Sequence, residues 1–313
     1  MRVLLALGGN AMTAADGSAT PEAQQTAVAG AMESVAGLIA AGHEVVITHG
    51  NGPQVGNLLV KNELSASVVP PVPLDWCGAQ TQATIGFTII NTLERSLGRL
   101  GCDSRVAAIV TRTRVDANDP GFAHPTKPIG RFLSHEKATR LVGHGQVWQD
   151  RGEKGWRRMV ASPAPLEVLE TDTVLTLIAA GYVVVAAGGG GIPVVHDPDG
   201  GVHGVEAVID KDLTAALLAR SVGADVLVIA TDVDNAIIGF ETPSARAIHA
   251  VTLEEMRDLS AAGHFASGSM GPKVAAAMQF VEQGGQRAVI TSLEHIESAV
   301  TGKFGTVIEG RSK

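Results

Sequence analysis

The sequence predicts an α/β fold with an open, mainly parallel sheet and helices on both faces of that sheet. Short apolar runs alternate along the chain with longer segments whose apolar residues have helical spacing. The runs at residues 3–7 and 226–230 are apolar at every position, as is typical of strands covered on both faces. Glycine or polar turn residues follow several of these runs directly, where the loops at the carboxyl ends of parallel strands belong.

The composition indicates a globular protein and excludes several functional classes. The chain has 313 residues, of which 45% are hydrophobic and 18% charged, enough for one large domain or two lobes. Its net charge of −8 argues against broad binding to nucleic acid or to anionic membranes. The longest uncharged runs are interrupted by polar residues, glycine or proline, so we expect no membrane span, and the apolar run at the amino end is too short for a signal peptide. We therefore expect a cytoplasmic protein with neither a nucleic-acid nor a membrane partner.

Cysteine and histidine give no sign of a metal site. Cys77 and Cys102 are the two cysteines, and their number and spacing offer neither a disulfide framework nor a zinc ribbon. The ten histidines lack the H-E-x-x-H pattern and other paired spacings. We expect no metal held by side chains alone.

The first third of the chain begins with a β-α-β unit. Thr20 followed by Pro21 predicts a helix start, because a capping residue precedes a proline at the first helical position. Gly42 predicts the end of that helix. Further elements are expected as strands at 44–48 and 105–110, helices at 54–62 and 75–99, and a proline-rich connector at 68–73.

Residues 116–165 have a different composition from the rest of the chain. They are richer in charge, Gly, Pro and Trp, and their periodicity is weak. Because long irregular segments in compact proteins are usually functional, we interpret this piece as an inserted subdomain or lid. A surface excursion without a function is the alternative.

Strands and helices alternate again after residue 165. Thr252 and Glu255 form a capping-box pattern that predicts a short helix, and Pro272 is expected to open a later one. The other predicted elements are helices at 172–180, 213–219, 273–283 and 293–301, strands at 182–187, 226–230, 288–291 and 305–309, and a hairpin at 196–203.

Special residues follow four of the predicted strands. Because ligands of open α/β sheets bind outside the carboxyl ends of the strands, we expect these four loops to border one crevice. Glycine lets the backbone approach an anion closely, and a following helix start adds a partial positive charge. The four loops are Gly8-Gly9-Asn10, Gly50-Asn51-Gly52, Gly188 to Gly191, and Thr231-Asp232-Val233.

Three lysines beside turns or helix starts indicate a site for phosphate. They are Lys127, Lys211 and Lys273, and no P-loop, dinucleotide-binding or protein-kinase motif accompanies them. Two interpretations of Asp210-Lys211-Asp212 remain open: Asp210 caps a helix and Lys211 is solvated, or Lys211 meets an anion with the aspartates compensating its charge. Phosphoryl transfer requires mainly positioning and positive charge, which fixed lysines beside glycine loops supply.

Six pieces of the chain together resemble the carbamate kinases, a branch of the amino acid kinase family. The resemblance covers nearly the whole chain and implies an eight-stranded αβα sandwich with a protruding subdomain, here residues 116–165. It also implies reversible transfer of a phosphoryl group between ATP and carbamate, giving ADP and carbamoyl phosphate, used to make ATP in arginine breakdown. The six pieces are residues 6–11, 48–56, 125–130, 188–193, 204–212 and 268–274.

The same resemblance implies roles for individual residues. Lys127, Lys211 and Lys273 would stabilise the transferring and leaving phosphates, with Asp210 organising the lysines. Residues 1–193 would form the lobe with the carbamate site and 194–313 the lobe with the nucleotide site. Mg²⁺ would arrive with ATP or ADP, and the protein would be a homodimer. The carbamate and transferring phosphate would meet Gly8, Gly9, Asn10, Gly50, Asn51 and Gly52, and the nucleotide would meet Gly189, Gly190, Thr231, Asp232, Val233, Met270, Gly271 and Lys273.

The chain departs from the family pattern at three places. Ala6 stands where relatives that act on amino acids often carry a lysine, which matches the carbamate branch. Residues 78–83 and Trp156 differ from the expected pattern, which puts local contacts in doubt. Two alternatives remain: a family member that phosphorylates an acidic amino acid or a nucleoside monophosphate, and a nucleotide-binding sensor without catalysis.

Overall fold

The chain is organised around one large, mainly parallel sheet. The computed structural model describes residues 1–13, 20–143, 145–265 and 270–310. Neighbouring strands of this sheet are parallel except β16 and β17, so the predicted sheet type is confirmed. Within the described ranges its eight strands lie in the order β15 (Ala250–Thr252), β17 (Thr306–Glu309), β16 (Arg287–Ser292), β12 (Val226–Thr231), β1 (Arg2–Leu7), β2 (Glu44–His49), β9 (Tyr182–Val185) and β3 (Arg105–Ala108).

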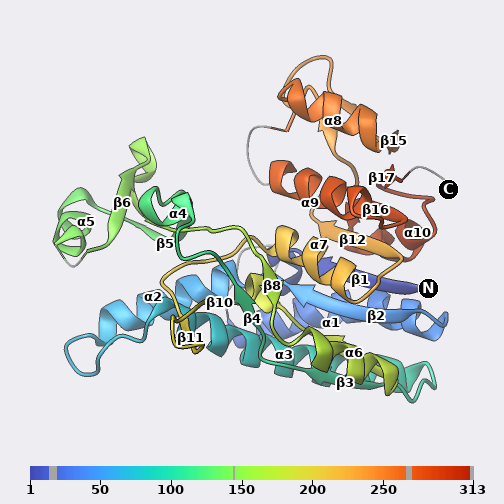
Figure 1. Cartoon of the computed structure of the whole chain (residues 1–313), viewed down its shortest axis with the longest axis horizontal. Helices are drawn as coiled ribbons and strands as arrows, with labels where there is room; N and C mark the ends of the chain where they lie inside the picture. Colours follow the sequence, from blue (N-terminus) through green and yellow to red (C-terminus); the bar gives the residue numbers. More distant parts are fainter. Residues whose placement is uncertain (14–19, 144, 266–269, 311–313) are drawn as a thin grey trace.

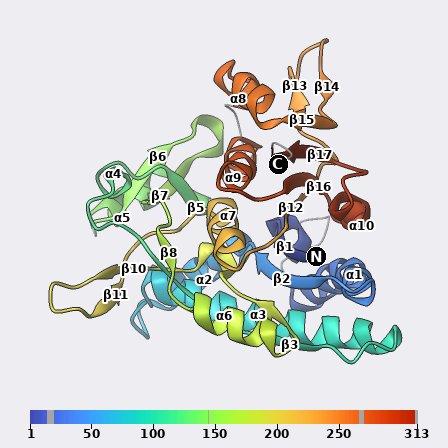
Figure 2. The same ribbon diagram turned by 45° about the vertical axis from the view of Figure 1, so that its right-hand side comes forward.

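Helices cover both faces of the sheet, which gives three layers. Because successive side chains of a strand point to opposite faces, Leu5 and Leu7 of β1 join one buried cluster and Leu4 and Ala6 join the other. Figure 2 shows α1 and α10 on one side of the strands and α7 and α9 on the other. The first layer contains α1 (Pro21–Ala40), α3 (Leu74–Arg99) and α10 (Ile296–Val300), and the second α6 (Thr171–Ala179), α7 (Lys211–Ser221), α8 (Leu253–Ala261) and α9 (Met270–Glu282).

Local signals set most helix ends as expected. Thr20 caps α1 by accepting a hydrogen bond from the backbone N–H of Ala23 at 3.2 Å, and Thr252 forms the predicted capping box with Glu255. The predicted start of the later helix at Pro272 is wrong, because α9 begins at Met270. Proline is tolerated there, since the first N–H groups of a helix have no partner one turn earlier.

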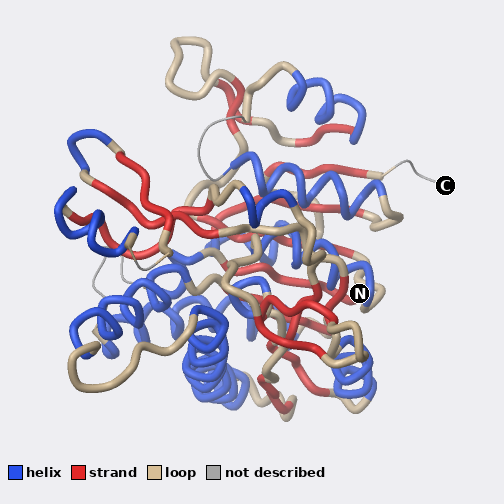
Figure 3. The backbone as a smooth tube through the Cα atoms, turned by 60° about the vertical axis from the view of Figure 1, so that its left-hand side comes forward, coloured by secondary structure: helices blue, strands red, loops and turns tan. Residues whose placement is uncertain are grey.

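The inserted piece has a sheet of its own. It projects from the central sheet (Figures 1 and 3) and is joined to the body beside α2 (Gly52–Ser65). Its strands are antiparallel and lie in the order β5 (Lys127–Leu133), β7 (Trp156–Val160) and β6 (Val147–Asp150), with α4 (Pro120–Ala123) and α5 (His135–Val142) beside them. The division into lobes at residue 193 stays a prediction.

Short strands supplement the central sheet. The expected hairpin forms between β10 (Ile192–His196) and β11 (Val202–Gly204), which continue into β4 (Arg112–Arg114) and β8 (Glu167–Val168). A second hairpin joins β13 (Ile237–Ile238) to β14 (Arg246–Ala247). The strand predicted at 105–110 ends at Ala108, and the last predicted helix is a 3₁₀ turn, Leu293–His295, followed by α10.

Among the described residues, no helix is both long and apolar enough to span a membrane.

Candidate active site

The four predicted loops lie next to one another at the same edge of the central sheet. They follow β12, β1, β2 and β9, which are consecutive and parallel in the sheet. Parallel strands bring their carboxyl ends to one edge, so residues that are far apart in the sequence become neighbours there. The four loops therefore meet at one edge of the sheet, and that all four border one crevice stays a prediction.

Glycine is required where the first two loops touch. A Cβ atom on Gly50 would lie 3.0 Å from the backbone nitrogen of Gly9, and one on Gly8 would lie 3.0 Å from the carbonyl oxygen of Ala230. The N–H of Gly8 already donates to Ala230 and that of Gly50 to Leu7, each at 2.9 Å. These two glycines thus allow close packing of the loops, while their own N–H groups extend the sheet.

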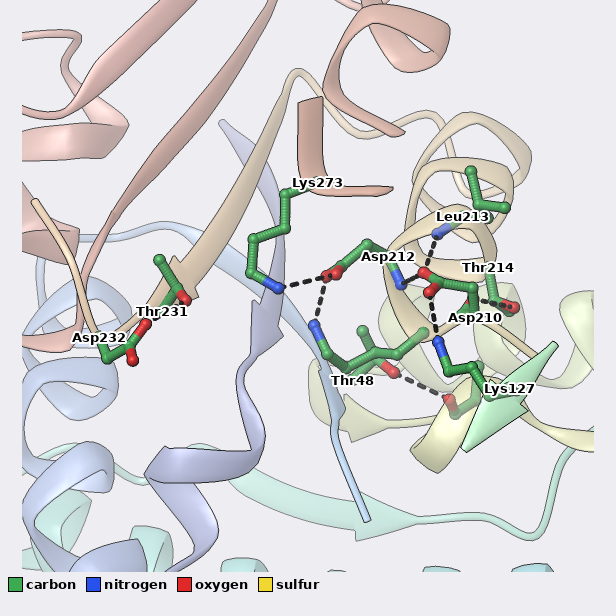
Figure 4. Close-up of polar contacts among 11 residues, drawn as sticks. Thr48, Lys127, Asp210, Asp212, Leu213, Thr214, Thr231, Asp232 and Lys273 are labelled. Atoms are coloured by element: carbon green, nitrogen blue, oxygen red, sulfur yellow. Dashed lines mark hydrogen bonds and ion pairs between the residues drawn. The ribbon is translucent and has the colours of Figure 1, made fainter. Parts of the chain in front are cut away.

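The start of α7 presents two aspartates in different directions. Asp210 is the N-cap, and its Oδ1 accepts hydrogen bonds from the backbone N–H groups of Asp212 at 2.9 Å and Leu213 at 3.4 Å. Its other oxygen accepts a hydrogen bond from Nζ of Lys127 at 2.8 Å. Lys127 extends from β5 of the inserted piece to reach this carboxylate (Figure 4).

Asp212 joins the other two lysines. Its Oδ2 accepts a hydrogen bond from Nζ of Lys273 at 3.1 Å, and its Oδ1 pairs with Nζ of Lys211. Lys273 points to Asp212 from α9, across the space between the two helix starts (Figure 4). The exposed fractions of these side chains are 13% for Lys211, 9% for Lys273 and 6% for Asp212. Two ammonium groups thus share a single buried carboxylate.

Burial and charge oppose one another in this cluster. Burial lowers the pKa of Lys211, the charge of Lys273 lowers it further, and Asp212 works in the opposite direction. Burial alone would raise the pKa of Asp212, but the two ammonium groups outweigh it and lower that pKa. With all three groups ionised, the cluster has one net positive charge in a site of low solvent exposure. A bound anion would compensate that charge.

A cavity of about 180 Å³ lies against the cluster and the strand ends. Lys211 and Lys273 line it, together with Gly8, Gly9, Thr231 and Asp232 from two of the predicted loops. Lys211, Lys273 and the first glycine loop therefore meet around one space of a size suited to phosphate groups.

Of the other predicted residues, those whose side chains the structure describes do not line this space. Gly189 and Gly190 belong to a 3₁₀ turn, and Cβ atoms there would lie 2.1 Å from the side chain of Asn51 and 2.7 Å from the carbonyl oxygen of Ile209. Gly52 and Gly271 are in the first turns of α2 and α9. Met270 begins α9, Val233 follows β12, and the backbone of Asn10 lies in the 3₁₀ turn Gly9–Met12. Gly268 and Ser269 lie outside the described residues. The contacts of these residues with substrates stay predictions.

Asp212 and His49 have larger parts in the site than the sequence patterns indicate. The resemblance implies that Asp210 organises the lysines; in the structure Asp210 pairs with Lys127, and it is Asp212 that pairs with Lys211 and Lys273. His49, at the end of β2, is 1% exposed, and burial lowers its pKa to about 4. The signal for His49 was its place directly before Gly50-Asn51-Gly52.

Residues 78–83, which differ from the family pattern, belong to α3 and hold two of the loops in place through side-chain hydrogen bonds. Thr81 accepts a hydrogen bond from Nδ2 of Asn51 at 2.9 Å. The side chain of Gln82 donates to the carbonyl oxygens of Thr111 and Gly188, each at 3.1 Å. These contacts fix the positions of Asn51 and of the third glycine loop.

Comparison with known proteins gives consistent matches along the chain. The sequence matches the amino acid kinase family over residues 1–292. It is 44% identical over 310 residues to a carbamate kinase of Pyrococcus furiosus, covering 98% of each chain. It is 43% identical over 311 residues to the carbamate kinase-like protein YahI of Escherichia coli, again covering 98% of each. The structure of a carbamate kinase from Giardia lamblia bound to AMP-PNP has 39% sequence identity and a TM-score of 0.94, covering 99% of this chain and 98% of that one.

Proposed function

Because the chain belongs to the amino acid kinase family, we propose that it is a carbamate kinase, which transfers a phosphoryl group reversibly between ATP and carbamate. The observation that carries the proposal is the pair of buried lysines sharing Asp212 beside the glycine loops. In the reverse direction the enzyme makes ATP from ADP and carbamoyl phosphate, in the cytoplasm. The similarity to carbamate kinases over almost the entire chain supports this choice of substrate.

The lysines act on the charge that moves during transfer. The γ-phosphoryl group spreads negative charge over its equatorial oxygens and leaves negative charge on ADP. Lys211 and Lys273, held by Asp212, meet that charge with preorganised ammonium groups, so little reorganisation is needed at the moment of transfer. Lys127, which pairs with Asp210 from β5, would close the side on which carbamate binds.

Mg²⁺ accompanies the nucleotide in this proposal. Among the described residues, no group of three or more His, Cys, Asp or Glu side chains could hold a metal ion. This fits Mg²⁺, which usually binds through substrate phosphates, water and one or two carboxylates. Asp232 lines the cavity and is the carboxylate placed to contribute. When bound, the ion would neutralise phosphate charge and align the β- and γ-phosphates.

We propose a homodimer formed through the outward face of α3. Trp76 and Phe87 are 61% and 62% exposed, and their spacing of eleven residues puts them on one face of the helix. The sequence has no charged residue between Asp75 and Glu94. Light scattering of Phe87→Glu should show monomers if a second copy covers this face, and an unchanged dimer would place the interface elsewhere.

A coupled assay tests the proposed reaction. ATP formation should depend on both ADP and carbamoyl phosphate, and in the other direction carbamate should be phosphorylated in preference to aspartate, glutamate or uridine monophosphate. If one of these larger acceptors has a higher kcat/KM than carbamate, the result would support the alternative, a family member that phosphorylates an acidic amino acid or a nucleoside monophosphate. ADP binding without turnover of any phosphate donor would identify a sensor.

A further inference from the structure

Glu206 joins three parts of the molecule that are distant in sequence. It lies in the segment between β11 and α7, a few residues before Asp210. Its Oε1 accepts a hydrogen bond from Nη2 of Arg158 on β7 at 2.7 Å. Its Oε2 accepts one from the backbone N–H of Leu74, the first residue of α3, at 3.1 Å. Glu206 therefore links the inserted piece, the first residue of α3 and the segment that leads to the lysine cluster.

The contact at Arg158 is connected to Lys127 through the small sheet. On the paired strands β5 and β7, Lys127 lies opposite Val160 and Ile129 lies opposite Arg158. Just beyond β7, the N–H of Val208 donates to the carbonyl oxygen of Ala161 at 3.0 Å. The inserted piece is thus fixed to the segment before α7 at neighbouring positions.

These contacts form a closed ring. Lys127 pairs with Asp210 on one side, and Arg158 pairs with Glu206 on the other. The two strands β5 and β7 connect the lysine to the arginine, and residues 206–210 connect the two carboxylates. If the Arg158–Glu206 pair is broken, one of the two ion pairs that close the ring is lost, and the position of Lys127 depends on fewer constraints.

The pair is better suited to positioning than to stabilising the fold. Arg158 is 14% exposed and Glu206 53%, and because the carboxylate is open to solvent we expect the pair to contribute only on the order of 1 kcal/mol to stability. A cavity of about 500 Å³, lined by residues that include Ile129, Arg158 and Glu206, leaves space under the junction. Small changes in position are costly in catalysis, since a misplacement of about 1 Å can reduce a rate by about 10²-fold.

We infer that Glu206 is a positioning residue for the phosphoryl-transfer site. Through Arg158 it sets the position of Lys127 over Asp210, and thereby the closure of the side that receives carbamate or carbamoyl phosphate. This inference rests on the proposed function, because its measure is the use of carbamoyl phosphate.

Steady-state kinetics of Glu206→Gln test the inference. Glutamine has the same shape and keeps an oxygen for the Leu74 N–H, but it removes the charge that Arg158 meets. We expect kcat/KM for carbamoyl phosphate to fall by about tenfold, whereas KM for ADP should change less than about twofold, because Glu206 bonds to Arg158 and Leu74 and not to the residues proposed for the nucleotide. Glu206→Asp, which keeps the charge, should restore part of the loss.

A double-mutant cycle separates positioning from general damage. If Glu206 acts through Lys127, Glu206→Gln should have almost no further effect on kcat/KM in a Lys127→Ala background. The inference would be overturned if Glu206→Gln reduced kcat/KM by the same factor in the wild-type and Lys127→Ala backgrounds. It would also be overturned if KM for ADP and thermal stability changed as strongly as kcat/KM for carbamoyl phosphate.

Glu167→Gln is the matched control. Glu167 is also 53% exposed and pairs with Arg114 at 2.9 Å, but on β8 of another sheet. Its kinetic constants should equal those of the wild type. A wild-type protein without ATP formation would refute the proposed function itself, while an active wild type with an equally active Glu206→Gln would refute only the role of Glu206.

Discussion

The start of α7 holds one lysine–aspartate pair that is partly exposed and one buried cluster in which two lysines share an aspartate. Lys127 and Asp210 are 2.8 Å apart, with exposed fractions of 39% and 14%. Lys273 and Asp212 are 3.1 Å apart, with exposed fractions of 9% and 6%, and Lys211 adds a second cation to the same carboxylate. The first contact comes from the inserted piece and the second from the central body.

The difference shows that distance alone does not determine what an ion pair does. A pair near solvent is screened and contributes little energy, so its use is to fix a position. A buried cluster is screened far less, and an excess of positive charge within it favours the binding of an anion. We therefore expect the buried cluster to govern the transfer rate and the exposed pair to govern the fit of the small substrate.

The largest expected effect is on stability, from removing the shared carboxylate. Asp212→Asn leaves Lys211 and Lys273 buried without their anion and should lower the free energy of unfolding by about 3–5 kcal/mol. Chemical denaturation measures this value. The matched variant Asp210→Asn keeps a residue that caps α7 well and should cost less than about 1 kcal/mol. If the two variants lost similar amounts of unfolding free energy, the buried cluster and the partly exposed pair would not differ in the way proposed.

A second effect concerns pH and the buried side of the site. Burial lowers the pKa of His49 to about 4, and Lys211 contributes to the lowering. Between pH 6.5 and about 4, the unfolded chain binds a proton that the folded chain does not. Stability should therefore fall with falling pH in this window, by up to about 1.4 kcal/mol per pH unit from this residue. NMR should show the His49 ring predominantly neutral between pH 7 and 5, and a midpoint near 6.5 would contradict this account.

A third effect is the response to inorganic phosphate. If one net positive charge is available at the cluster, phosphate should stabilise the folded protein, by about 2.7 kcal/mol at a concentration of 100 Kd. Thermal unfolding in phosphate, compared with chloride at equal ionic strength, measures this shift. Lys273→Ala should lose it and Lys127→Ala should keep most of it. Loss of equal size in both variants would mean that the exposed pair also holds the anion.

The smallest effect concerns the exposed pair and salt. The ammonium group of Lys127 is partly open to solvent, where the Debye length is about 8–10 Å at moderate ionic strength and becomes shorter as salt is added. Raising the salt concentration should therefore weaken the attraction between Asp210 and Lys127. The ratio of KM for carbamoyl phosphate between Lys127→Ala and wild type should therefore shrink as salt rises. A ratio that stays constant would indicate that this pair is as well shielded as the buried one.

The sequence predicted the parts of the site that depend on sheet topology. Apolar runs followed by Gly8, Gly50 and Thr231 indicated parallel strands, and parallel strands bring their ends together. Lys211 and Lys273 were placed at helix starts, which face the same edge. The αβα layers followed from the alternation of strands and helices.

The partners of individual side chains could not be predicted. Asp210 and Asp212 flank the same lysine, and the sequence does not tell which carboxylate faces α9 and which faces β5. The strands at 112–114 and 167–168 are too short to show an alternating pattern. The link from Glu206 to Arg158 joins segments whose relative placement depends on the tertiary fold.

The central claim is that Lys211 and Lys273, joined by one carboxylate, supply the positive charge on which transfer depends. The rate of ATP formation from saturating ADP and carbamoyl phosphate, measured in a single turnover, tests it most directly. Lys211→Ala should reduce this rate by about 10²-fold or more, while the Kd for ADP measured by calorimetry changes only a few-fold. A variant that transfers the phosphoryl group as fast as the wild type would contradict the account.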